Sequence, residues 1–334
     1  MVNQREKFVC FFLSIKSFLK IFIIINNLKK RKKISSFWIE YFFLKESILK
    51  LYINFLIFRY FKNECYFKNI IIPYEEKTCE RSIIHGINKN KKNRDSKIYS
   101  FCINPQHNLS IFLNDFTKLK IPRSNNYLFC GPLYQNYFKD LKRVNKLNIN
   151  DIGSNKWNVK NFKYNKSRNY LVLLSHINEF YELAKYQEEL NKLKKYNFIL
   201  RPYPHASDIN LIKAYIENNS LLNFRISNNS LISDIKKSFA VIFCATSAGL
   251  EAISYGRMGL WSNFSKVGIN PMFNRVDLFN PSFNAKQLLK KMENIDKMSY
   301  LELDKKIKKQ QIFCNRIYSK INKNLINKYF NNEK

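Results

Sequence analysis

The chain is poor in glycine, proline and acidic residues. Among its 334 residues are 7 Gly and 8 Pro, and its 25 Asp and Glu are outnumbered by 58 Lys and Arg. Lys, Asn, Ile, Phe and Tyr are abundant instead, a joint pattern typical of a strongly AT-rich genome, and we attribute most of the formal charge of +33 to that bias. The hydrophobic fraction of 46% argues against disorder, and the length leaves room for two domains of ordinary size.

The cysteines form no recognisable ligand or disulfide pattern. They are widely spread, with no C-x-x-C pair and no histidine at metal-ligand spacing. Several lie inside apolar runs, which is typical of buried, reduced thiols in a cytosolic protein. The sequence therefore predicts neither a structural zinc site nor a disulfide framework.

Residues 1–61 lack both a cleavage site and a long uncharged apolar run. Residues 8–25 are apolar but contain Lys16 and Lys20, and a second apolar block at 37–60 is interrupted by charges. A signal peptide is therefore not expected, and a membrane span needs about 20 mostly uncharged apolar residues. We predict amphipathic helices that either pack in the N-terminal domain or lie on the inner face of the membrane, where each basic residue contributes about 1 kcal/mol.

From about Lys68 onward, short apolar runs alternate with helix-like stretches. The expected strands are residues 69–72, 98–103, 127–130, 170–174, 198–200, 221–226 and 239–243. The expected helices include residues 75–89, 179–195, 209–217, 230–237 and a long basic one at 301–329, and the Asn- and Lys-rich segment 138–167 is predicted to be a linker. This alternation predicts an α/β fold with parallel sheets. We expect two Rossmann-like domains, residues 62–150 and 165–334, preceded by the helices of residues 1–61.

The clearest chemical signal is the stretch 240–259, AVIFCATSAGLEAISYGRMG. Its apolar run stops at the small polar triplet Ala245-Thr246-Ser247, and a helix-like pattern then continues to Gly256. A strand, a tight turn and a helix are expected. The first N–H groups of a helix have no partner within it and the helix dipole favours negative charge there, so this turn predicts an anion site suited to a nucleotide phosphate.

Two further polar segments follow predicted strands of the second half. They are Arg201-Pro202-Tyr203-Pro204-His205 and the loop 227–230, after which Ser230 is expected to cap a helix. In open parallel sheets, ligands bind beyond the carboxyl ends of the strands. The ordered set R-P-x-P, S-L-x-x-D-I and T-S-A-G-L-E-A resembles the C-terminal nucleotide-binding domain of GT-B-fold glycosyltransferases that build bacterial surface polysaccharides such as capsule and lipopolysaccharide.

The resemblance implies specific roles. Thr246 and Ser247 would grip the donor phosphate, Gly249 would allow close backbone approach, and Glu251 would bind the ribose or sugar. The implied nucleotide-sugar site comprises Arg201, Tyr203, His205, Ser230, Thr246, Ser247, Gly249 and Glu251. Tyr203 stands where these enzymes usually have His, and tyrosine cannot neutralise phosphate as imidazolium does. Purely structural roles stay open: a rigid loop exit, a helix cap and a solvated glutamate.

The N-terminal half resembles the same enzymes more faintly. An inverting sugar transfer needs a general base for the acceptor hydroxyl and charge stabilisation at the departing phosphate. The candidate bases are Glu75, Glu76 and His107, each near the end of a predicted strand. Favourable charge at a helix start, for the two glutamates, and a hydrogen-bonded structural role, for the histidine, are the alternatives.

The sequence therefore predicts a cytoplasmic glycosyltransferase that transfers a sugar from a nucleotide-activated donor to a surface glycan or lipid-linked acceptor. It predicts no cofactor and no metal, because no D-x-D pair with suitable flanks occurs. Peripheral attachment to an anionic inner membrane face is expected only if residues 1–61 dock there. The alternatives are a catalytically degenerate nucleotide- or glycan-binding protein and a basic nucleic-acid binder, which lacks any recognisable nucleic-acid-binding signature. Nucleic acid is therefore not an expected partner.

Overall fold

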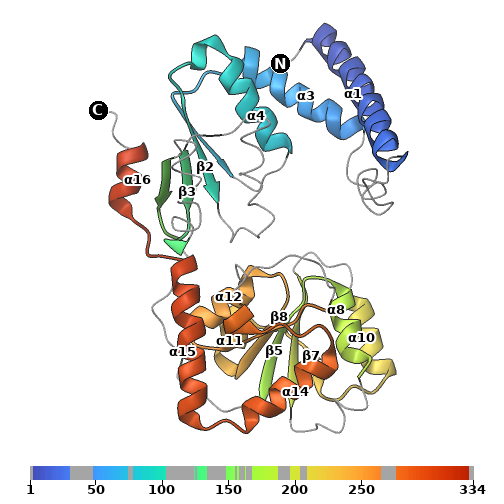
Figure 1. Ribbon diagram of the computed structural model, residues 1–334, viewed down its shortest axis with the longest axis vertical. Helices are drawn as coiled ribbons and strands as arrows, with labels where there is room; N and C mark the ends of the chain where they lie inside the picture. Colours follow the sequence, from blue (N-terminus) through green and yellow to red (C-terminus); the bar gives the residue numbers. More distant parts are fainter. Residues whose placement is uncertain are drawn as a thin grey trace. The chain divides into compact units, whose positions relative to one another are not determined.

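The computed structural model divides the chain into two compact units (Figure 1). Unit 1 comprises Met1–Cys102, Leu113–Leu128 and Asp140–Ile149, and unit 2 comprises Ile103–Phe112, Phe129–Lys139 and Asn150–Lys334. The residues that the structure describes are 3–30, 48–73, 78–102, 124, 126–133, 148–154, 156–157, 162, 168–186, 196–203, 209–264 and 276–330.

Unit 1 is built on a four-stranded sheet with the order β1-β2-β3-β4. Its strands are β1 (Asn69–Pro73), β2 (Lys97–Cys102), β3 (Asn126–Phe129) and β4 (Asn148–Asp151). β1 and β2 run parallel, with Ile70 opposite Ile98. Ile72 and Ile98 form a small core with Ile84 and Ile87 of α4 (Thr78–Lys89).

Two long helices precede this sheet, α1 (Gln4–Lys30) and α3 (Ile48–Asn63). α3 packs on α4, where the ring of Phe58 stacks on His85 with ring centroids 4.9 Å apart, and α1 contacts α3 through Phe11 and Tyr52. None of the helices in the described part of the chain combines the length and apolar character that crossing a bilayer requires.

Unit 2 contains a five-stranded, fully parallel sheet with the order β7-β6-β5-β8-β9. Its strands are β5 (Asn169–Leu173), β6 (Asn197–Arg201), β7 (Phe224–Ile226), β8 (Ala240–Phe243) and β9 (Met258–Trp261). Its helices are α8 (Ile177–Ala184), α10 (Ile209–Asn218), α11 (Leu231–Lys237), α12 (Ser247–Ser254), α13 (Val276–Phe279), α14 (Ala285–Asp296), α15 (Tyr300–Ile317) and α16 (Lys323–Phe330). The predicted alternation of strands and helices is confirmed.

Side chains alternate across this sheet as the pleat requires. Tyr170 and Val172 of β5 enter the main core together with Phe180 of α8 and Leu288 of α14. Phe243 of β8 instead faces α12. Both faces of the sheet are therefore covered by helices, as is usual for parallel sheets.

Two sequence predictions were wrong in unit 2 and at its border. The segment 138–167, predicted to be a linker, contains β4, and the single helix predicted at 301–329 is two helices, α15 and α16. The break between α15 and α16 has a tertiary cause. The backbone between α15 and α16 bonds to distant segments: the N–H of Ser319 donates to Cys130 O at 2.8 Å, and the N–H of Asn322 donates to Ile152 O at 3.0 Å.

Glycines make this close approach feasible. A Cβ at Gly131 would lie 2.3 Å from the carbonyl oxygen of Ile317, and one at Gly153 would lie 2.3 Å from that of Lys320. Gly153 also has a φ of +82°, a left-handed conformation that glycine adopts without strain. The chain around residues 130 and 153 therefore meets the α15–α16 junction backbone to backbone.

Candidate functional site

The order of strands in unit 2 reverses between β5 and β8. The carboxyl ends of these two strands are therefore the expected ligand site of the sheet. Strand register brings the ends together: Leu173 of β5 pairs with Arg201 of β6 on one side and with Phe243 of β8 on the other. The segments that follow these residues leave the sheet at the same edge. The structure thus brings the Arg201 and Thr246 segments to one side of unit 2.

The predicted strand, turn and helix of 240–259 are confirmed as β8, Cys244–Thr246 and α12. Thr246 is the N-cap, with φ −85° and ψ 135°, and its Oγ1 accepts a hydrogen bond from the N–H of Ala248 at 3.3 Å. This cap satisfies the N–H of Ala248, and the N–H of Gly249 donates to Thr246 O at 3.2 Å. The phosphate-gripping role of Thr246 and Ser247 stays a prediction.

Gly249 lies on the buried side of α12. A Cβ built on it would come within 2.2 Å of Cγ in the Phe243 ring. Because Gly249 has no side chain, α12 can pack closely against β8. This close packing determines where the first turn of α12 lies relative to the carboxyl end of β8. Close backbone approach to a ligand, the role implied for Gly249 from sequence, stays a prediction.

A cluster of four polar side chains surrounds the first turn of α12. Lys156 Nζ donates to Ser247 Oγ at 3.3 Å, and the same ammonium lies 6.0 Å from the ring centre of Tyr318. Glu251, one helical turn after Ser247, is partly buried, and burial raises the pKa of its carboxyl while the charge of Lys156 opposes the rise. We call Lys156, Ser247, Glu251 and Tyr318 the α12 cluster. α12 and α15, which ends beside Tyr318, are in contact (Figure 1).

Sequence reasoning found Ser247 and Glu251 but missed Lys156 and Tyr318. Lys156 belongs to the segment predicted to be a linker, and Tyr318 to the helix predicted to be continuous. Tyr318 is buried, and burial raises the pKa of its hydroxyl well above the ordinary value, with Ser247 opposing that rise. Neither residue lies in a motif, and only the fold places them at the start of α12.

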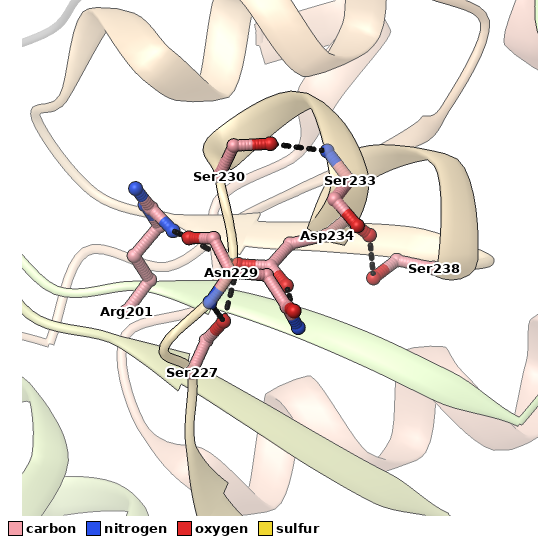
Figure 2. Close-up of polar contacts among 7 residues, drawn as sticks. All are labelled: Arg201, Ser227, Asn229, Ser230, Ser233, Asp234 and Ser238. Atoms are coloured by element: carbon pink, nitrogen blue, oxygen red, sulfur yellow. Dashed lines mark hydrogen bonds and ion pairs between the residues drawn. The ribbon is translucent and has the colours of Figure 1, made fainter.

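Arg201 is held in a polar network that joins β6, the loop after β7 and α11 (Figure 2). Its Nη1 donates to Asp234 Oδ2 at 2.9 Å and to Asn229 O at 2.7 Å. The Asp234 side chain is fully buried and also accepts from Ser227 Oγ at 2.6 Å and Asn229 Nδ2 at 3.2 Å. Ser230 caps α11 by accepting from the N–H of Ser233 at 3.3 Å. The charge of Arg201 is therefore already balanced by Asp234.

The exit of β5 contributes a second acidic group that sequence reasoning did not single out. The N–H of Ser175 donates to Glu179 Oε2 at 2.9 Å, and burial raises the pKa of Glu179, with that hydrogen bond opposing the rise. The hydroxyl of Ser175 is buried without a hydrogen-bond partner among the described residues. A serine that follows a strand is a common loop residue, so the sequence around Ser175 gives no signal of a site. Only the strand order, which reverses next to β5, distinguishes this position.

The remaining predicted residues divide into two groups. Tyr203 is described, and its side chain is 56% exposed just past β6. Glu75, Glu76, His107 and His205 lie outside the described residues. The catalytic assignments therefore stay predictions.

The network around Asp234 predicts the effect of removing its cation. We expect Arg201→Ala to lower the free energy of unfolding by about 2–3 kcal/mol, because it leaves a buried carboxylate without its charged partner. Arg225→Ala, in the exposed middle of β7, is the matched control and should cost at most about 0.5 kcal/mol. Urea unfolding curves measure both. Equal losses in the two variants would show that the Arg201–Asp234 pair contributes nothing particular.

The raised pKa of Glu251 predicts a pH-dependent gain on its removal. The folded protein binds this proton more tightly than the unfolded chain, so the ionised form destabilises the fold at neutral pH. Glu251→Gln should raise Tm at pH 7, and the gain should vanish below about pH 4, where the wild-type carboxyl is protonated in both states. Exposed Glu217→Gln serves as the control. A lower Tm for Glu251→Gln at pH 7 would mean that Lys156 outweighs burial.

No protein-family model matches the chain, and no curated protein matches it in sequence. Solved structures do match. S. aureus MnaA, solved with UDP, has a TM-score of 0.53 at 7% identity, over 84% of this chain and 81% of that one. The UDP-GlcNAc 2-epimerase of Neisseria meningitidis, bound to UDP-GlcNAc, has a TM-score of 0.52 at 10% identity, over 78% of this chain and 76% of that one.

A variant of S. aureus TarM, in complex with fondaparinux, alpha-GlcNAc-glycerol and UDP, gives a TM-score of 0.43 at 13% identity, over 83% of this chain. The chain spans little more than half of TarM, 56% of its length. The matches to MnaA and to the UDP-GlcNAc 2-epimerase, with TM-scores above 0.5 at 7% and 10% identity, show a common fold and no more than that. The chain has the α/β fold of the GT-B type, with two Rossmann-like units preceded by N-terminal helices, as the sequence predicted.

Proposed function

We propose that this protein is a glycosyltransferase that uses a nucleotide-activated sugar and transfers it to a cell-surface glycan or lipid-linked acceptor, as in capsule or lipopolysaccharide synthesis. The observation that carries the proposal is the start of α12. It lies at the strand-order reversal of a parallel sheet and presents the Thr246 and Ser247 hydroxyls at the positive end of the helix dipole. These groups suit the diphosphate of a nucleotide sugar.

The α12 cluster extends this assignment beyond a phosphate. Glu251 follows Ser247 by one turn on the same helix, and a carboxylate there can accept hydrogen bonds from the hydroxyls of a ribose or sugar. Burial of Glu251 strengthens such bonds, because water competes less in a low-dielectric site. A diphosphate at Ser247 and hydroxyls at Glu251 would place the nucleotide sugar along the first two turns of α12.

The acceptor-side base is proposed to come from the N-terminal half of the chain. A general base must take the proton of the acceptor hydroxyl as the new glycosidic bond forms. Glu75 and Glu76 follow β1 in the chain and His107 follows β2, and these two strands are parallel. The reaction as proposed needs no metal, since helix N–H groups and cationic side chains can stabilise the departing diphosphate.

Two other activities compete with this proposal. MnaA and the UDP-GlcNAc 2-epimerase both match with TM-scores above 0.5 over most of their length, which favours a nucleotide-sugar epimerase as the second candidate. Tyr203 in place of histidine favours a third, a degenerate protein that binds nucleotide sugars without turning them over. All three share the nucleotide site at α12.

A nucleotide-sugar panel tests the proposed site. Thermal shifts are measured with UDP-, GDP-, CMP- and dTDP-sugars, with and without EDTA. We expect one nucleotide class, UDP on the precedent of the fold's solved complexes, to raise Tm, and Thr246→Ala with Ser247→Ala to abolish the shift. The same double variant should cost about 1 kcal/mol of stability through loss of the cap.

Ser299→Ala is the matched control, because it removes the N-cap of α15 and leaves α12 unchanged. It should keep the ligand-induced shift. Product analysis then separates the activities: sugar transfer to an added glycan acceptor, epimerised nucleotide sugar without acceptor, or binding alone. Absence of a shift with every donor would refute the nucleotide site.

We further propose that α1 and α3 attach the protein to an anionic membrane surface, the inner face of the cytoplasmic membrane. Large apolar side chains are exposed on both helices: Phe8, Phe11, Phe12, Leu19, Phe22 and Ile23 on α1, and Leu49, Ile53 and Tyr60 on α3. A hollow of about 570 Å³ lies between the two helices. Exposed Lys7, Lys16 and Lys20 lie on α1. Apolar groups flanked by lysines are typical of helices that lie in the membrane interface.

Vesicle sedimentation tests this attachment. We expect binding to vesicles with phosphatidylglycerol and release at high salt, because each lysine contributes about 1 kcal/mol that salt screens. The double variant Phe8→Ser, Phe12→Ser should bind more weakly while keeping the fold, since both rings are exposed. The same changes at exposed Leu211 and Leu222 of unit 2 are the control. Binding indifferent to both salt and the Phe8 and Phe12 changes would refute the proposal.

A further inference from the structure

Among the described residues, the predicted phosphate ligands provide no positive charge that is free of an acidic partner. Arg201 is paired with buried Asp234, and the Tyr203 side chain supplies no ammonium, guanidinium or imidazolium group. A diphosphate at α12 carries two or more negative charges, and a helix N-terminus supplies only about half a unit of positive charge. A cation close to Ser247 is therefore needed to balance the ligand.

Lys156 meets this requirement from outside the predicted motifs. Its ammonium lies 3.3 Å from Ser247 Oγ, the hydroxyl expected to contact the phosphate. An ammonium that already reaches this hydroxyl can also reach an oxygen bound to it, because the lysine side chain carries three rotatable N–H donors on a flexible stem. Lys156 and Ser247 belong to the same unit.

The fold fixes the backbone that carries Lys156. The N–H of Lys156 donates to Ser154 Oγ at 3.1 Å, and the N–H of Ser154 donates to Ser319 O at 2.9 Å. Ser319 Oγ also lies 2.7 Å from both carboxyl oxygens of Asp151. The backbone between α15 and α16 thus fixes residues 151–154 by hydrogen bonds. Lys156, which bonds to Ser154, is thereby positioned beside the first turn of α12.

The Tyr318 hydroxyl is a second, independent observation at the start of α12. Its side chain is 1% exposed, and its hydroxyl makes no hydrogen bond of normal geometry within the described part of the chain. Ser247 is nonetheless near enough to influence the pKa of that hydroxyl. A buried hydroxyl without a good hydrogen bond costs about 1–3 kcal/mol of stability, and a phosphate oxygen at Ser247 would accept a hydrogen bond from it.

We infer that Lys156 is the cationic ligand of the donor's diphosphate, acting with Ser247 and the hydroxyl of Tyr318 at the start of α12. This inference rests on the proposed function. During transfer, the bond from the anomeric carbon to the diphosphate oxygen breaks, the acceptor oxygen bonds to that carbon, and the acceptor proton passes to the base. The departing nucleoside diphosphate gains negative charge, which the ammonium of Lys156 stabilises.

Calorimetric titration tests the inference with UDP, GDP and dTDP, each beside its nucleoside. We expect Lys156→Gln to weaken the diphosphate that binds wild type by about tenfold to a hundredfold, the worth of a hydrogen bond to a charged group. The affinity for the nucleoside should be unchanged, and the salt dependence of diphosphate binding should become shallower. Lys156→Arg should keep most of the affinity. Lys290→Gln, an equal charge change on the exposed face of α14, should have no effect.

Each other result overturns a defined claim. Wild-type affinity for the diphosphate in Lys156→Gln, with a loss in Ser247→Ala, refutes the role of Lys156 and leaves the proposed function standing. Equal weakening of diphosphate and nucleoside shows that Lys156 only supports the structure. Failure of wild type to bind any of the three diphosphates refutes the proposed function, and the inference with it. Tm values without ligand establish whether each variant is folded.

Discussion

Close packing of α12 against β8 is the constraint on which the site depends. Because Gly249 has no side chain, the helix approaches the ring of Phe243 to a distance that any Cβ would prevent. The first turn of α12 therefore starts at the carboxyl edge of the sheet, beside the reversal between β5 and β8. The positions of Ser247, Glu251 and the helix N–H groups all follow from this contact. Buried aromatic rings in a dense core move little, so these donors are held in place before any ligand arrives.

Local signals predicted the half of the site that local structure determines. The end of an apolar run at Ala245-Thr246-Ser247 marks a strand, a turn and a cap within a few residues, and Ser230 capped its helix as expected. The break between α15 and α16 has no such signal. It arises where Ser319 and Asn322 bond to Cys130 and Ile152, well over a hundred residues away in the sequence. β4 was missed for a different reason: Ile149 is its one buried apolar residue, which is too little to predict a strand.

The excess of lysine hides Lys156, the proposed cationic ligand, in the sequence. Among 58 Lys and Arg, one lysine in a polar Asn-rich segment carries no pattern that distinguishes it. Arginines in the motif positions were easier to find, yet Arg201 balances Asp234, and buried Arg257 donates to Ile235 O at the end of α11. Residue type and position after a strand therefore predict where a charge lies. They do not predict whether another side chain of the protein already compensates that charge.

The two polar networks of unit 2 differ in whether all of their polar groups have hydrogen-bond partners. Around Asp234, both carboxyl oxygens have partners, and Arg201 supplies the opposite charge, so this network needs nothing more and stabilises the fold by itself. The α12 cluster instead contains a partly buried carboxyl with a raised pKa and the buried hydroxyl of Tyr318, which lies near Ser247 and makes no hydrogen bond of normal geometry among the described residues. Proteins retain such costly groups mainly where function requires them. A phosphate at Ser247 would give Tyr318 its acceptor and Lys156 its counter-charge, and sugar hydroxyls would give Glu251 its donors. The hydrogen-bond partners and the charge that the side chains of the cluster would gain thus correspond to the phosphate and the hydroxyls of a nucleotide sugar.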